Sequence, residues 1–184
     1  IGAENPEDYG YYFWWGDTIG YNRVNDKWVA SDGSSSNFSF DDYNTPTYDK
    51  TYSELKSEGW ITSSGVLAPE HDAAQVKWGS NWRMPTKEEC QELLDSCTWT
   101  WTTLNDVDGY MVESKKNGNC IFLPAAGMYS GSSFNNAGLQ GGIWCSTSKD
   151  GDKNSAPDLY FTSSKCGLGS DLRFNGRSIR PVRK

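Results

Sequence analysis

The sequence has few of the residues on which most catalysis and nucleic-acid binding depend. Its 184 residues include a single histidine, and 17 lysines and arginines stand against 24 aspartates and glutamates, which leaves a net charge of −7. A chain this acidic repels phosphate backbones, so nucleic acid is not an expected partner. No apolar run approaches the length of a membrane span, so direct insertion into a membrane is not expected either.

Cysteine is present but not in a metal-binding or disulfide pattern. The five cysteines, at positions 90, 97, 120, 145 and 166, are an odd number without the spacing of a zinc site. We expect them to be small buried side chains, with one or two thiols exposed. The chain's only histidine, His71, stands where a helix is predicted to begin and has no nucleophile beside it, so no catalytic residue is expected.

Two acidic turns, at residues 106–108 and 150–154, begin like calcium loops. The second has Ser155 where such a loop needs glycine and Phe161 where it needs an acidic residue. Solvated turns explain both segments, so the sequence predicts no metal site and no cofactor.

Aromatic residues, by contrast, are abundant at 14% of the chain, with nine tryptophans and ten tyrosines. Aromatic side chains favour strands, so we expect a strand-and-turn protein with a few helices. Its length favours one domain over residues 1–184.

Two helices are predicted, over residues 71–78 and 86–97. Asp72 stands at the start of the first and Gly79 at its end. In the second, Thr86 and Glu89 have the spacing of a capping box, and apolar residues recur along one side.

Strands are predicted near the start and in the middle of the chain. Residues 9–15 are rich in aromatic strand formers and should form a first strand. A three-stranded meander is predicted after residue 98, where Trp99 and Trp101 alternate with threonines. We expect these two tryptophans to be largely buried, together with Trp82 and Trp144.

Two stretches lack a hydrophobic period. Residues 25–52 are predicted to form a long loop packed by Phe38, Phe40 and Tyr43. Residues 167–176 show a period of neither 2 nor 3.6, so neither a strand nor an amphipathic helix is expected there. The last third of the chain, from residue 123 to 184, thus has the character of a displayed surface.

Several motifs in that last third resemble a known family. FLPAAG at 122–127, GSSFNNAG at 131–138, WCST at 144–147 and NGRSIRPVR at 175–183 look like the C-terminal variable region of diversity-generating retroelement proteins from gut Bacteroidetes and their phages. In that family, a C-type lectin fold of the formylglycine-generating-enzyme subclass displays residues that the retroelement rewrites by mutating template adenines. The segment WRMPT at 82–86 between two predicted helices is similar to the two-helix core of bacterial C-type lectin domains.

The resemblance implies an α+β, C-type lectin-like fold, with two helices, a twisted antiparallel sheet and long irregular loops. It also implies that the first strand, at residues 9–15, pairs with the last, at residues 178–183, so that the termini lie together. It further implies that residues 128–176 are the displayed variable region and that Trp144, Arg173, Arg177 and Arg180 hold the backbone beneath it. The ligand-binding positions that it implies are Gly142, Ile143, Tyr160, Thr162, Gly167, Gly169, Ser170, Asp171, Leu172 and Phe174.

The genetic code offers a check on these ten positions. An AAC codon with randomised adenines cannot encode Lys, Gln, Glu, Met or Trp, and none of the ten positions carries one of these residues. Gln140 and Lys165, in the same stretch, are residues that such a codon cannot encode. Tyr160, Leu172 and Phe174 would be the anchors of a binding surface, because aromatic and apolar side chains carry most interface energy.

The function that the resemblance implies is ligand binding, as in a receptor-recognition or adhesin domain. The partner would be a protein or glycan on a cell surface, the domain a monomer, and the parent protein extracellular, on a bacterial surface or a phage virion. One alternative is a calcium-independent carbohydrate-binding lectin domain of a bacterial surface protein. A minor alternative is a formylglycine-generating-type oxidase that uses Cys145 and Cys166.

Overall fold

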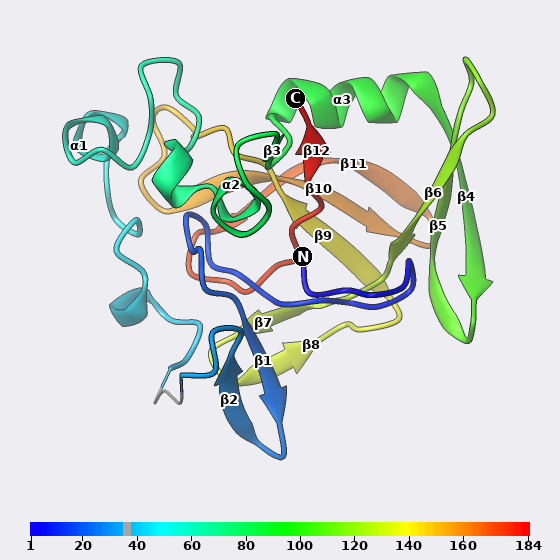
Figure 1. The fold of residues 1–184 in the computed structure, drawn as a ribbon, viewed down its shortest axis with the longest axis horizontal. Coiled ribbons are helices and arrows are strands. Elements are labelled where there is room, and N and C mark those ends of the chain that lie inside the picture. Colours follow the sequence, from blue (N-terminus) through cyan, green and yellow to red (C-terminus); the bar gives the residue numbers. More distant parts are fainter. Residues whose placement is uncertain (35–37) are drawn as a thin grey trace.

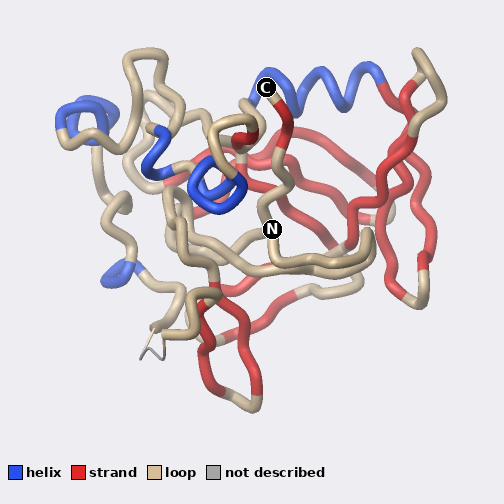
Figure 2. The backbone as a smooth tube through the Cα atoms, viewed as in Figure 1, coloured by secondary structure: helices blue, strands red, loops and turns tan. Residues whose placement is uncertain are grey.

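The computed structural model describes residues 1–34 and 38–184, and these form a mixed structure of few helices and many antiparallel strands (Figure 1). One long helix runs along the top of the molecule, shorter helical segments lie at its left and near its centre, and most strands lie below and to the right of them (Figure 2). The described residues contain three α-helices, namely α1 (Tyr52–Ser57), α2 (Ala73–Trp78) and α3 (Lys87–Ser96). None of these helices is both long enough and apolar enough to cross a membrane.

Two three-stranded antiparallel sheets form most of the structure. One is a meander in the order β4 (Cys97–Leu104), β5 (Val107–Ser114) and β6 (Cys120–Pro124). The other has the order β11 (Lys165–Leu172), β10 (Ser155–Thr162) and β9 (Gln140–Trp144). Three two-stranded pairs complete the fold: β1 (Tyr21–Val24) with β2 (Lys27–Ala30), β3 (Trp82–Arg83) with β12 (Val182–Arg183), and β7 (Met128–Ser130) with β8 (Ser133–Asn135).

Capping residues explain where the two predicted helices begin. The Thr86 hydroxyl accepts a hydrogen bond from the Glu89 amide at 3.2 Å, and the Glu89 carboxylate accepts one from the Thr86 amide at 2.9 Å. The capping box of α3 is therefore confirmed. At α2, one carboxylate oxygen of Asp72 accepts hydrogen bonds from two amides of the first turn, and Gly79, at a φ of 87°, ends the helix. Residues 69–71, ahead of α2, form a short 3-10 helix.

A third helix, α1, was not predicted, although its cap has the same pattern. Thr51 and Glu54 form a second capping box, and only Leu55 of the six helical residues is buried. The region predicted as one long loop, residues 25–52, begins at the turn of the β1–β2 hairpin, where Asn25 and Asp26 have φ values of 50° and 60°, and it contains strand β2. Phe38 and Phe40 are buried as expected, whereas Tyr43 is 94% exposed.

The chain ends meet, but not by the predicted pairing. The Ile1 nitrogen donates to the Ile179 carbonyl at 2.8 Å, so the expectation that the termini lie together is confirmed. Residues 9–15, however, contribute only isolated bridges, such as Phe13 with Arg177. The last strand, β12, pairs with β3 instead.

Helix α3 lies across one face of the β9–β11 sheet, with the β4–β6 meander beside it (Figure 1). Apolar side chains from these elements form a shared core cluster that contains Val112, Leu159 and Phe161. Trp99 and Trp101 pack on this cluster but are only half-buried, as is Trp82 on a neighbouring cluster. Of the four tryptophans expected to be buried, only Trp144 is wholly inaccessible.

Candidate functional site

The β9–β11 sheet has one face packed under α3, while its opposite face is buried against a second core cluster at one end and open at the other. Residues paired across antiparallel strands point to the same side, so the register assigns each side chain to a face. Ile143, Leu159 and Leu168 are paired with one another and lie on the core face, under α3. The opposite face, called the outer face below, carries Gln140, Gly142, Trp144, Ala156, Asp158, Tyr160, Thr162, Lys165, Gly167, Gly169 and Asp171.

The structure brings six of the ten predicted positions together on the outer face. These six are Gly142, Tyr160, Thr162, Gly167, Gly169 and Asp171. Gly142, however, is buried, so the expectation that it is displayed is wrong. Strand β11 itself contradicts the expectation that no strand exists over residues 167–176. Its place is set by backbone pairing with β10, which requires no hydrophobic period.

The other four positions do not lie on that face. Ile143 is 5% exposed and belongs to the core, so the expectation that it is displayed is wrong: it follows Gly142 in β9, and alternation turns it inward. Ser170 and Leu172 point to the core side but are exposed, because β11 is an edge strand. Phe174 follows β11, and its ring packs against Tyr48 with centroids 5.0 Å apart.

A buried arginine covers part of the outer face. Nε of Arg177 donates to a carboxylate oxygen of Asp171 at 2.6 Å and lies 3.3 Å from one of Asp158. The guanidinium also lies 6.0 Å from the centre of the Trp144 ring. A Cβ atom at Gly142 would fall 1.6 Å from Nη1 of Arg177, so the absence of a side chain there makes room for the guanidinium.

Asp158 is the second acid of this cluster and is 1% exposed. Burial raises its pKa to about 6, against the opposing effect of the Arg177 charge. Its carboxylate oxygens accept no hydrogen bond from the described residues. A Cβ atom at Gly169 would lie 2.7 Å from one of these oxygens, so Gly169, like Gly142, leaves space for a buried charged group.

Arg173 fixes the chain that leaves β11. It is completely buried, and its guanidinium donates to the carbonyl oxygens of four residues: Thr47, Lys50, Asp152 and Ser155. The guanidinium carbon lies 5.2 Å from the Trp15 ring centre. Arg180 similarly donates to the carbonyls of Pro6 and Phe122. Of the four residues expected to hold the backbone beneath the variable region, Arg173 contacts main-chain carbonyls beside β11, whereas Arg177 contacts side chains and Arg180 contacts carbonyls outside residues 128–176.

The rest of the outer face is open. We define the open half of the sheet face as Gln140, Tyr160, Thr162, Lys165 and Gly167. The Lys165 ammonium lies 5.3 Å from the Tyr160 ring centre, and the Tyr160 hydroxyl approaches the Gln140 amide oxygen at 3.5 Å. A Cβ atom at Gly167 would meet no heavy atom within 4 Å. The face therefore has room for new side chains here.

Gln140 and Lys165 were not among the positions that the resemblance implied, and neither residue can arise from a mutated AAC codon. The structure nevertheless places both on the open half, with Lys165 paired to Thr162 and Gln140 on the other side of Thr162. The hairpin turn at Ser163 and Ser164 was the signal that could have aligned these residues from the sequence.

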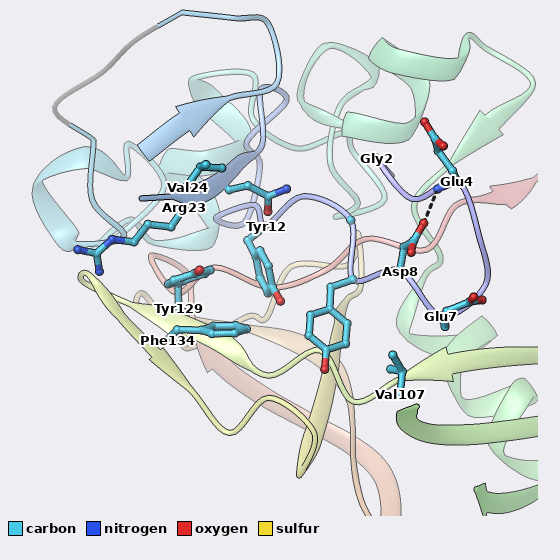
Figure 3. A pocket seen from close by; sticks show the side chains of 13 residues that line it. Gly2, Glu4, Glu7, Asp8, Tyr12, Arg23, Val24, Val107, Tyr129 and Phe134 are labelled. Atoms are coloured by element: carbon cyan, nitrogen blue, oxygen red, sulfur yellow. Dashed lines mark hydrogen bonds between the residues drawn. The ribbon is translucent and has the colours of Figure 1, made fainter. Parts of the chain in front are cut away.

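A second hollow lies on another side of the molecule (Figure 3). This groove has a volume of about 610 Å³ between the N-terminal segment, β1 and the β7–β8 hairpin. The side chains of Glu4, Glu7 and Asp8 line one side and the rings of Tyr12 and Phe134 the other. Sequence reasoning missed this groove, because its walls come from segments more than a hundred residues apart.

The groups that could support catalysis or metal binding are buried or dispersed. Within residues 1–34 and 38–184, no three histidine, cysteine or acidic side chains gather in a way that could hold a metal ion. The His71 ring packs at 4.0 Å against Trp60, and burial lowers its pKa. A hydrogen bond to Cys90 and burial raise the pKa of Cys145, and burial raises that of Cys166, so both thiols are held in the less reactive neutral form.

The fold and the site together define a mixed α and β domain with small antiparallel sheets, in which one sheet face is partly open and partly covered by the buried Arg177. No family model, curated protein or solved structure matches this chain. Its function is therefore inferred from its own residues.

Proposed function

We propose that the chain is a ligand-binding domain whose recognition surface is the open half of the sheet face, extended around the edge strand β11 by its exposed residues Gly169, Ser170 and Leu172. The observation that carries the proposal is that one part of this sheet face is closely packed while another part has free space. Gly167 has free space around it, whereas Gly142, two strands away on the same face, is packed against Arg177. A surface of this kind can change its side chains while its backbone stays in place.

Several features support a C-type lectin-like scaffold of the kind that retroelement variable proteins display. The termini lie together, α3 follows the Trp82-Arg-Met-Pro segment, and the candidate surface is formed by the last long hairpin of the chain. On this proposal the ligand is a protein or glycan on a cell surface. The parent protein would be extracellular, on a bacterial surface or a virion, and the domain would act as a monomer without a metal or cofactor.

Two display libraries of equal size test the proposal. The first randomises Tyr160, Thr162 and Gly167, and the second randomises Gly142, Ile143 and Asp171. We expect most members of the first library to resist protease and most members of the second to be cleaved, since the second library disrupts the core and the Arg177 pairing. Selection of the first library against cell-surface proteins and glycans should then give binders whose affinity depends on these positions.

Two results would refute the proposal. Equal loss of folding in both libraries would show that the open half is structural. Binding of the parent domain to cell-surface preparations that survives simultaneous alanine substitution of Tyr160, Thr162 and Lys165 would place the recognition surface elsewhere. Tyr43→Ala is the matched control, because Tyr43 is an exposed aromatic residue outside the open half.

The groove in Figure 3 favours calcium-independent carbohydrate binding as a second candidate function. Aromatic rings stack on sugar rings, and carboxylates accept hydrogen bonds from sugar hydroxyls. The groove contains aromatic rings and carboxylates. Phe134 is 45% exposed and is the ring most available for stacking. Binding to a glycan array in the presence of EDTA, lost on Phe134→Ala but kept on Tyr43→Ala, would support this function. The absence of glycan binding would exclude it.

A further inference from the structure

Two buried cysteines lie in contact beneath the candidate recognition sheet. Cys90 is on α3 and 3% exposed, and Cys145 directly follows β9 and is 0% exposed. Their sulfur atoms are 3.4 Å apart, and both side chains belong to the core cluster that α3 shares with the sheet. Within residues 1–34 and 38–184, no other two cysteine sulfurs are in such contact.

We propose that Cys90 and Cys145 form a disulfide bond when the protein folds in an oxidising environment, which cross-links α3 to β9. A disulfide holds its sulfurs about 2.05 Å apart, so the two atoms have to approach by little more than an ångström. A small apolar cavity of about 150 Å³, lined by Cys90, Leu93, Ile143 and Leu159, adjoins the pair and gives the Cys90 side chain room to turn. The inference does not depend on the proposed ligand-binding function.

The oxidation requires a disulfide donor, such as oxidised glutathione or a thiol–disulfide oxidoreductase. One cysteine thiolate attacks the donor and forms a mixed disulfide, with release of one donor thiol. The second cysteine thiolate then attacks the protein sulfur of that mixed disulfide and releases the other donor thiol. In total, two S–H bonds are lost, one S–S bond forms, two protons leave, and the donor gains two electrons. The reaction runs before the core closes, because in the native protein both thiols are shielded from donors.

The other three cysteines are placed differently. Cys120 is exposed at the start of β6, and Cys97 and Cys166 are half-buried. An exposed thiol exchanges with glutathione but gains no partner, so these three should remain alkylatable. A bond between Cys90 and Cys145 also closes a loop of more than fifty residues, which restricts the unfolded chain strongly.

The experiment starts from the unfolded, reduced wild-type chain. One sample is refolded in a glutathione redox buffer and a second in a reducing agent. Both are then denatured in the presence of N-ethylmaleimide, and the intact mass of each is measured by mass spectrometry. We expect three maleimide adducts after oxidative refolding and five after reductive refolding. Peptide mapping of the oxidised sample should find the Cys90 and Cys145 peptides joined. The oxidised protein should melt roughly 10 °C higher than the reduced protein.

Matched variants separate this bond from other effects. Cys97→Ala should keep the cross-link and the melting difference, while Cys90→Ala should abolish both. If a variant fails to fold, the peptide map of the wild-type chain still decides the question. Five adducts after oxidative refolding, or a map that joins other cysteines, would overturn the proposal.

Discussion

Alanine substitutions at two glycines of the outer face should have opposite effects on stability. At Gly142, the added Cβ would lie 1.6 Å from Nη1 and 2.6 Å from Cζ of Arg177, so the whole guanidinium has to move by more than an ångström. Arg177 is 4% exposed and pairs with Asp171 and Asp158. Breaking a buried ion pair leaves uncompensated charge in the interior, which costs about 3–5 kcal/mol.

Gly167→Ala should instead stabilise the protein slightly. No heavy atom lies within 4 Å of the added Cβ, and the backbone there is in the ordinary strand region. Glycine inside a strand is less stable than alanine by roughly 0.5–1 kcal/mol, because it loses more conformational freedom on folding. At about 2–4 °C per kcal/mol for a domain of this size, Gly142→Ala should lower the melting temperature by roughly 10 °C, and Gly167→Ala should raise it by about 2 °C.

Urea and thermal unfolding, followed by tryptophan fluorescence, measure both changes, since Trp144 is buried beside Arg177. A double-mutant cycle isolates the cause: in an Arg177→Ala background the steric conflict is gone, so Gly142→Ala should cost at least about 1 kcal/mol less than in the wild type. A Gly142→Ala protein as stable as the wild type would refute the assigned packing. So would a Gly167→Ala protein that loses several kcal/mol.

Three further predictions concern the supporting residues. Burial raises the pKa of Asp158 to about 6, above its unfolded value of about 4, so stability should fall as pH rises through this window by up to about 3 kcal/mol. Urea titrations at pH 4 and pH 8 should show a smaller difference in stability for Asp158→Asn than for the wild type. If Asp158→Asn is less stable than the wild type at pH 8, the pairing of Asp158 with Arg177 outweighs the cost of its burial. Thr86→Ala should cost about 1 kcal/mol by removing the α3 cap, measured by melting temperature, and no change would mean that the cap is redundant. Arg173→Lys should lower the stability by more than about 2 kcal/mol, because one ammonium group cannot reach all four carbonyls. The urea midpoint measures this loss. A variant as stable as the wild type would show that a positive charge alone is enough to hold these carbonyls.

Local signals predicted the elements that local interactions form. The capping residues Thr86 and Glu89 predicted α3, since a cap requires only residues three apart. The same pattern at Thr51 and Glu54 was overlooked because α1 has six residues and a single buried side chain, which gives no hydrophobic period. Strand β11 could not be predicted from periodicity, because half of its residues are glycine, serine or aspartate, and its partner strand determines its structure.

The candidate site could be predicted only as a stretch of chain. Glycine, serine and asparagine mark where a surface is displayed, but they do not show which side of a strand each residue faces. Gly142 and Ile143 are neighbours in sequence, yet one lies under Arg177 and the other in the core behind the sheet. Both assignments depend on the register with β10, which no pattern in β9 alone reveals.

The two buried arginines hold the sheet in different ways, and this difference limits which positions can vary. All four carbonyl acceptors of Arg173 belong to the main chain, so its hydrogen bonds do not depend on the side chains of the residues that it contacts. Arg177 depends on two carboxylates, and one of them belongs to Asp171, which also accepts a hydrogen bond from the Asn175 side chain at 2.8 Å. A change at Asp171 removes partners from both residues at once. We therefore expect Asp171 to belong to the fixed support, and variation that preserves the fold to be confined to positions such as Tyr160, Thr162 and Gly167, whose side chains hold no buried charge.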